Sequence, residues 1–140
     1  MSFLKIKDKL INKNSIVQLI TEDVDNIFGN GLQIQFITDT GNHIDIIFDN
    51  QAEKYETLDY ILTKLQRGYC CDLYEFSKGE YINLHKVENI HIEKSNETTW
   101  IYVVLNDKKY MTEIFEYNKD FYDCFESPED LLDEIEERVV

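Results

Sequence analysis

The side chains that could supply nucleophilic or metal chemistry are three cysteines and three histidines: Cys70, Cys71, Cys124, His43, His85 and His91. On a strand, two adjacent cysteines point to opposite faces, so Cys70 and Cys71 cannot jointly hold one tetrahedral metal ion. The sequence contains no C-x-x-C pair and no H-E-x-x-H motif, and no metal-ligand spacing ties a histidine to a cysteine or an acid. We therefore predict no metal site.

Covalent catalysis requires an activated cysteine or serine beside a base, and no local signature such as G-x-S-x-G supports one. Gly29-Asn30-Gly31 matches neither the dinucleotide-binding fingerprint nor a P-loop. No pair of carboxylates suited to acid–base work stands out among the 28 acidic residues. We predict that the protein is not an enzyme and has no cofactor.

The most unusual chemistry lies at the C-terminal end. Residues 110–140 hold eleven carboxylates against two cations, Lys119 and Arg138. Ser127 followed by Pro128 is typical of a helix start, and Asp130 completes a capping box in its short-chain form. The sequence therefore predicts a C-terminal helix. Its apolar positions form a narrow stripe, and acids occupy the remaining arc; the stripe consists of Leu131, Leu132, Ile135 and Val139.

This end of the chain supplies the candidate partner-binding residues. Carboxylates on a helix recur about 5–6 Å apart, a spacing comparable to the phosphates of a nucleic acid. Aromatic residues are interleaved with these acids, Tyr110 and Phe115 among them. Aromatic rings are typical anchors at protein interfaces. The alternative is that the rings are core and the acids only form the wet face of a surface helix. The candidate residues are Glu126, Glu129, Asp130, Asp133, Glu134, Glu136, Glu137, Tyr117, Phe121, Tyr122 and Phe125.

The charge balance restricts the partners. The 140 residues carry a formal net charge of −14. A surface this acidic would repel the phosphates of nucleic acids and anionic membranes, and it would attract basic proteins. We expect no direct nucleic-acid binding and no membrane binding; the alternative is that the charge serves only solubility.

The sequence also suggests a compartment. Charged residues interrupt the apolar ones in the opening MSFLKIKDKLINKN, so we expect no signal peptide. No run of apolar residues reaches the length of a membrane-spanning helix. An odd number of cysteines without a framework spacing fits a reducing environment. We therefore predict a cytoplasmic protein.

Hydrophobic periodicity predicts an α+β fold, mainly antiparallel β-sheet, in a single domain spanning 1–140. Short strands with close turns fill the chain from 69 to 116, with the most apolar segment, 100–105, expected at the centre of a sheet of about six to eight strands. A hairpin is expected over 32–48. The remaining expected elements are a short N-terminal helix over 2–12, a strand over 15–20, a middle helix over 51–67 ended by Gly68 and the acidic C-terminal helix.

A small, acidic, aromatic-rich chain of this kind, with its acidic residues concentrated over 121–137, resembles phage-encoded inhibitors of bacterial defence, including anti-CRISPR and DNA-mimic proteins. It also resembles immunity proteins that neutralise nuclease toxins. The resemblance rests on composition and carries no residue-level motif. It implies a stoichiometric inhibitor that occupies the basic groove of a CRISPR-associated or other defence nuclease, in the host cytoplasm if the gene belongs to a phage.

Two alternatives remain open at this point. One is an immunity protein paired with a nuclease toxin. The other is a phage virion or assembly component, for which self-association would be the sign. The sequence does not specify the oligomeric state.

Overall fold

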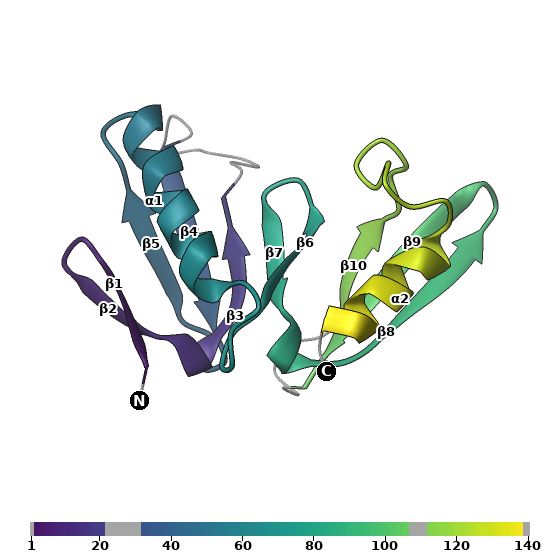
Figure 1. Cartoon of the computed structure of the whole chain (residues 1–140), viewed down its shortest axis with the longest axis horizontal. Coiled ribbons are helices and arrows are strands. Elements are labelled where there is room, and N and C mark those ends of the chain that lie inside the picture. The colour runs from purple at the N-terminus through teal and green to yellow at the C-terminus, as the bar shows by residue number, and fades with distance from the viewer. Residues whose placement is uncertain (1, 22–31, 107–111, 139–140) are drawn as a thin grey trace. The chain divides into compact units, whose positions relative to one another are not determined.

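A computed structural model of the chain describes residues 2–21, 32–106 and 112–138. Two short 3₁₀ turns, Lys13–Ser15 and Leu84–Lys86, interrupt the strands. The other elements are β1 (Phe3–Ile6), β2 (Lys9–Asn12), β3 (Ile16–Ile20), β4 (Gln33–Thr38), β5 (His43–Ile47), α1 (Gln51–Leu65), β6 (Leu73–Ser77), β7 (Glu80–Asn83), β8 (Val87–Ser95), β9 (Thr98–Leu105), β10 (Glu113–Glu116) and α2 (Pro128–Arg138) (Figure 1).

The elements confirm an α+β class dominated by antiparallel sheet. They gather into two compact units, which we call unit 1 (Met1–Leu84) and unit 2 (His85–Val140). Within the described residues, the strands form three sheets, ordered β1-β2, β5-β4-β3-β7-β6 and β10-β9-β8, instead of the one sheet expected from the sequence. Strand β7 pairs with β3 on one side and with β6 on the other, so both of its hydrogen-bonding edges are occupied and β8, the next strand in the chain, does not pair with it. That the chain is a single domain stays a prediction.

The five-stranded sheet of unit 1 contains the predicted hairpin. Strands β4 and β5 pair antiparallel, with Phe36 opposite Ile44 and Ile34 opposite Ile46. Phe36, Ile34 and Ile46 are buried, while Gln35 on the other face donates to Asp45 over 2.8 Å. The period-two alternation in the sequence therefore identified both the strands and their faces.

Helix α1 lies over this sheet and confirms the predicted middle helix (Figure 1). Asn50 caps its first turn by accepting from the Glu53 backbone N–H over 2.8 Å. Ile61 and Leu65 are buried in the core, whereas Tyr55 near the start of the helix is 61% exposed. Lys54 lies buried instead and donates from Nζ to the Thr21 carbonyl over 2.6 Å.

The N-terminal segment corrects the prediction of a helix over 2–12. Strands β1 and β2 form a hairpin whose inward side chains, Leu4 and Ile6 from β1 and Ile11 from β2, belong to the unit 1 core. Lys7 in the turn has a positive φ of 53°. Its ammonium group donates to the Ile47 carbonyl and pairs with Glu53, so tertiary contacts select a hairpin over the helical spacing.

The end of α1 also differs from the prediction. Arg67, not Gly68, adopts the left-handed conformation, with φ 57°. Gly68 serves a close approach instead, because a Cβ there would lie 2.9 Å from the carbonyl oxygen of Cys71. The Gly68 N–H donates to that carbonyl over 3.1 Å, which closes a tight turn over residues 68–71.

Unit 2 contains a three-stranded sheet with β9 at its centre, so the segment 100–105 is central as predicted, although the sheet is smaller than the six to eight strands expected. Val103 lies opposite Ile90 on β8 and Glu113 on β10. The pairing of β8 with β9 shifts register between Val87 and Asn89. Three features named from the sequence lie outside the described residues, namely Gly29-Asn30-Gly31, Tyr110 and Val139.

The turn at Gly68 yields a stability test. We expect Gly68→Ala to lower the free energy of unfolding by about 1–3 kcal/mol, since the new methyl group would overlap a backbone oxygen that cannot move freely. Arg67→Gly is the matched control and should be neutral or stabilising, because glycine adopts a positive φ without strain. Urea unfolding followed by circular dichroism measures both. Equal stability of Gly68→Ala and wild type would contradict the close approach.

Candidate functional site

The start of α2 fixes the orientation of the acidic helix. The Asp130 carboxylate oxygen Oδ2 accepts from the backbone N–H groups of Glu126 and Ser127, each over 3.2 Å. This contact supplies the acidic half of the predicted capping box and ties the incoming loop to the first helical turn. Asp130 is half-buried, so its carboxylate serves the fold of unit 2.

The apolar side of α2 packs on one face of the three-stranded sheet. Leu131 is 0% and Ile135 7% exposed, and on β9 Ile101 and Val103 are fully buried. Lys94 on β8 pairs with Glu129 over 3.7 Å, which places the helix on the sheet face that Lys94 shares with Ile101. This ion pair is solvent-exposed and contributes less than about 1 kcal/mol. The buried side chains, at about 1.5–3 kcal/mol each, hold the helix in place.

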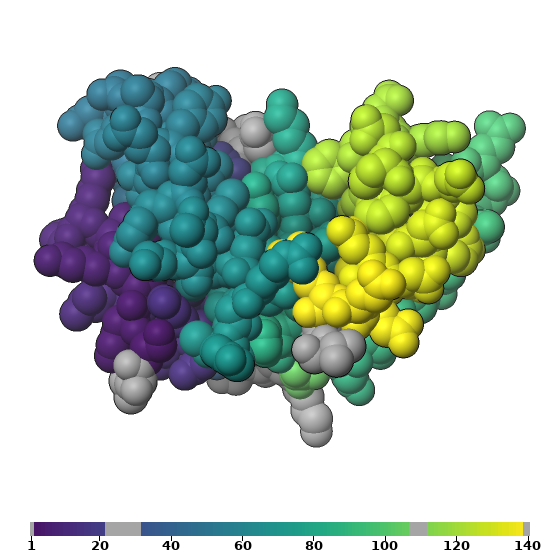
Figure 2. All heavy atoms as spheres, in the orientation of Figure 1, coloured from purple at the N-terminus to yellow at the C-terminus, as the bar shows by residue number. Residues whose placement is uncertain are grey.

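The opposite side of α2 carries exposed carboxylates. Successive positions along one helix face hold Glu129, Asp133, Glu136 and Glu137, and all four side chains are exposed. We call these four residues the acidic ridge. Figure 2 shows α2, in yellow, as an open surface of unit 2. Glu126 precedes the helix and is also exposed, whereas Glu134 is half-buried beside the ridge.

The candidate aromatic anchors form one cluster in the loop before α2. Tyr117 and Tyr122 stack with ring centroids 5.3 Å apart, and Phe121 meets Tyr122 edge-on at 4.7 Å. The ring centroid of Phe125 lies 6.2 Å from that of Tyr122. Tyr122 is only 3% exposed, so its ring supports the interior of unit 2. Tyr117, Phe121 and Phe125 are half-buried.

The Tyr117 hydroxyl is an unusual group in this cluster. Its oxygen is buried and has no hydrogen-bond partner among the described residues. Burial, followed by the nearby charge of Asp130, the Cys124 thiol and Glu129, raises the pKa of Tyr117 above its ordinary value of 10.0. An unsatisfied buried hydroxyl destabilises the folded state.

Sequence reasoning missed a second surface, on the other face of the same sheet. Trp100 lies opposite Glu93 on β8 and Glu116 on β10. Tyr102 stacks on His91 with centroids 5.0 Å apart, and His91 approaches Glu93 over 3.5 Å. The alternation in 98–105 could have placed both aromatic rings on one face. Only the strand pairing brings the two glutamates beside them.

The residues considered for covalent or metal chemistry do not form a common site. Cys71 is buried and Cys70 half-buried in unit 1, while Cys124 is exposed in unit 2. Within the described ranges, no three His, Cys, Asp or Glu side chains gather in a way that could hold a metal ion. Among the helices described, none is long and apolar enough to cross a membrane. The absence of enzymatic activity and of a cofactor stays a prediction.

The capping role of Asp130 can be measured. Asp130→Ala removes the acceptor for two backbone N–H groups and should lower the free energy of unfolding of unit 2 by about 1 kcal/mol. Asp130→Asn retains an acceptor and should lose less. The fluorescence of Trp100, the single tryptophan, reports urea unfolding of this unit. Glu136→Ala, at an exposed position of the same helix, is the control; a loss as large as that of Asp130→Ala would contradict the assignment.

Replacing Tyr117 by Phe should stabilise the protein by about 1 kcal/mol, because it removes a buried hydroxyl that lacks a partner. The raised pKa keeps this hydroxyl protonated in the folded state at a pH where the unfolded chain ionises. Wild-type stability should therefore fall as the pH rises above about 10, and the advantage of Tyr117→Phe should widen there. Thermal unfolding between pH 7 and strongly alkaline pH, with Tyr122→Phe as the control, tests this; a destabilised Tyr117→Phe at neutral pH would refute it.

Comparison with known proteins gives no family assignment: no family model, no curated protein and no solved structure matches this chain.

Proposed function

We propose that this protein is a non-enzymatic inhibitor that binds a basic, nucleic-acid-handling protein through the acidic ridge of α2. A CRISPR-associated or other defence nuclease is the proposed class of target. The observation that carries the proposal is the outward, fixed arrangement of Glu129, Asp133, Glu136 and Glu137 on a helix whose opposite side is buried.

The charge distribution supports this surface over the rest of the chain. Unit 2 contains fifteen acidic and six basic residues, a net charge of −9, and unit 1 contains thirteen acidic and eight basic residues, a net charge of −5. Unit 2 is the shorter of the two. Its field would steer a basic partner towards it and accelerate association at low salt.

The number of charges per length of the acidic ridge can be compared with that of duplex DNA. The ridge extends over about 12 Å of helix axis, at 1.5 Å per residue. A DNA duplex carries about seven phosphate charges over that length, whereas the ridge carries four. To match the charge density of duplex DNA, the surface would also need the acids of the loop before α2. Three of these acids are exposed, namely Asp120, Asp123 and Glu126.

The half-buried residues Tyr117, Phe121 and Phe125 precede the helix that carries this surface, and, in addition to burial, the nearby charge of Glu129 raises the pKa of Tyr117. Aromatic side chains bind with little loss of conformational entropy and dominate many interfaces. In the proposed complex, the ridge supplies long-range attraction and the rings supply the desolvated contact. An immunity protein against a nuclease toxin would use the same surface; the identity of the partner distinguishes the two.

The test is a comparison of three baits. The ridge variant combines Glu129→Gln, Asp133→Asn, Glu136→Gln and Glu137→Gln. The control variant removes the same four charges from exposed positions of unit 1, by Asp8→Asn, Asp49→Asn, Glu56→Gln and Asp59→Asn. Proteins retained from bacterial lysate are identified at low and high salt, and the nucleic-acid cleavage or binding of each purified partner is then assayed with each bait.

We expect that wild type and the control variant both retain at least one basic nucleic-acid-handling protein and inhibit its activity. The ridge variant should lose at least about tenfold in affinity, and retention should decrease steeply with salt. An equal loss of affinity in the ridge and control variants would mean that net charge alone drives binding, which would contradict a specific role for the ridge. Retention that is insensitive to salt, or a partner unaffected in activity, would also contradict the proposal.

A further inference from the structure

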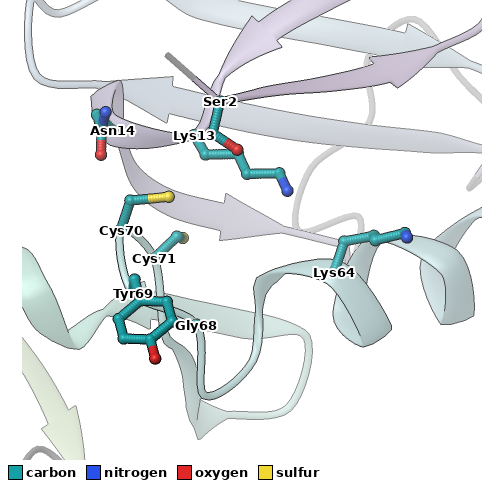
Figure 3. Close-up of a pocket in the computed structure, with 8 residues that line it drawn as sticks. All are labelled: Ser2, Lys13, Asn14, Lys64, Gly68, Tyr69, Cys70 and Cys71. Carbon is teal, nitrogen blue, oxygen red and sulfur yellow. The ribbon is translucent and has the colours of Figure 1, made fainter.

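Unit 1 contains a cavity of about 560 Å³ beneath the N-terminal hairpin. Ser2 and the 3₁₀ turn, with Lys13 and Asn14, form one side, and the turn after α1, with Cys70 and Cys71, forms the other (Figure 3). Figure 3 shows the Cys70 thiol pointing towards the side of Ser2 and Lys13. The volume lies in the range of small-molecule sites.

The charge of this cavity is opposite to that of the protein. Two lysines, Lys13 and Lys64, line it, and no aspartate or glutamate is among its described lining residues. Neither ammonium group makes an ion pair with a residue that the structure describes. In a chain with twice as many acids as bases, two unpaired lysines beside one cavity favour an anionic ligand.

The walls are held by buried hydrogen bonds and need little rearrangement. Asn83, which is fully buried, donates to the Ile16 carbonyl over 2.7 Å and accepts from the Asp72 N–H over 2.9 Å. Asp72 in turn accepts from the Arg67 N–H over 2.8 Å. These bonds fix the turn that carries Cys70 from behind. On the opposite wall, the Lys13 N–H donates to the Ser2 carbonyl over 3.0 Å.

We propose that this cavity binds a small phosphate-bearing molecule, of the size of a sugar phosphate or a mononucleotide. A phosphomonoester carries a charge of about −1.5 to −2 at neutral pH, enough to pair with both lysines, which a single carboxylate is not. The exposed Lys64 side chain, which Figure 3 shows extending away from Cys70, would turn towards the bound phosphate. The Ser2 hydroxyl and the Asn14 amide supply neutral donors for the ester and hydroxyl oxygens. Free phosphate would leave most of the volume empty. This site lies in unit 1, so it is independent of the function proposed for unit 2.

Cys70 provides a direct readout, because it lines the cavity and is partly exposed. Alkylation by iodoacetamide is followed by mass spectrometry, with the exposed Cys124 as an internal control. The probes are ribose 5-phosphate and AMP, each compared with its phosphate-free counterpart, ribose or adenosine. At ten times the dissociation constant, a phosphorylated probe should slow alkylation of Cys70 about tenfold and leave Cys124 unchanged.

The double variant Lys13→Gln, Lys64→Gln should weaken this protection at least about tenfold, whereas Lys78→Gln, at an exposed position outside the cavity, should not. Stronger protection by AMP than by ribose 5-phosphate identifies a nucleotide site, and equal protection identifies a sugar-phosphate site. The proposal is overturned if neither phosphorylated probe protects Cys70, if the phosphate-free probes protect equally, or if the lysine variant behaves like wild type.

Discussion

The packing of α2 on the three-stranded sheet determines which charges unit 2 presents. Leu131 and Ile135 are buried on the sheet face that carries Ile101 and Val103, and this packing sets the rotation of the helix about its axis. Because a helix has 3.6 residues per turn, the rotation alone decides that Glu129, Asp133, Glu136 and Glu137 face outwards. A small apolar contact therefore organises four carboxylates, and the charges themselves contribute little to holding the helix.

The same contact separates acids that look equivalent in the sequence. Asp130 is committed to the backbone of the loop before α2, and Glu129 is shared with Lys94. Asp133, Glu136 and Glu137 lie on the exposed arc of the ridge. The aromatic residues divide in a similar way, since Tyr122 lies at the centre of the cluster while Phe121 and Phe125 remain partly exposed around it. In the proposed complex, recognition of a basic surface would therefore use an anionic helix face on which the fold of unit 2 does not depend.

Local sequence patterns correctly predicted the elements in which apolar residues repeat with a regular spacing or in which capping residues mark an end. The alternation in 32–48 and the capping residues of α2 gave the hairpin, its faces and the helix start. The prediction was wrong where long-range contacts outweighed local spacing, as at residues 2–12, where Lys7 contacts Ile47 and Glu53 from a hairpin turn. It was also wrong where a backbone approach required glycine, as at Gly68. The cavity beside Lys13 and Lys64 could not be predicted, because its two walls are about fifty residues apart in the chain.

Carboxylate footprinting of the complex tests the central claim most directly. Free and partner-bound protein are treated with a carbodiimide and an amine, and the extent of modification is measured at each acidic residue. We predict that binding protects Glu129, Asp133, Glu136 and Glu137, while the exposed acids of unit 1, such as Glu56 and Asp59, react as in the free protein. Protection confined to unit 1, with the ridge fully reactive in the complex, would contradict the account.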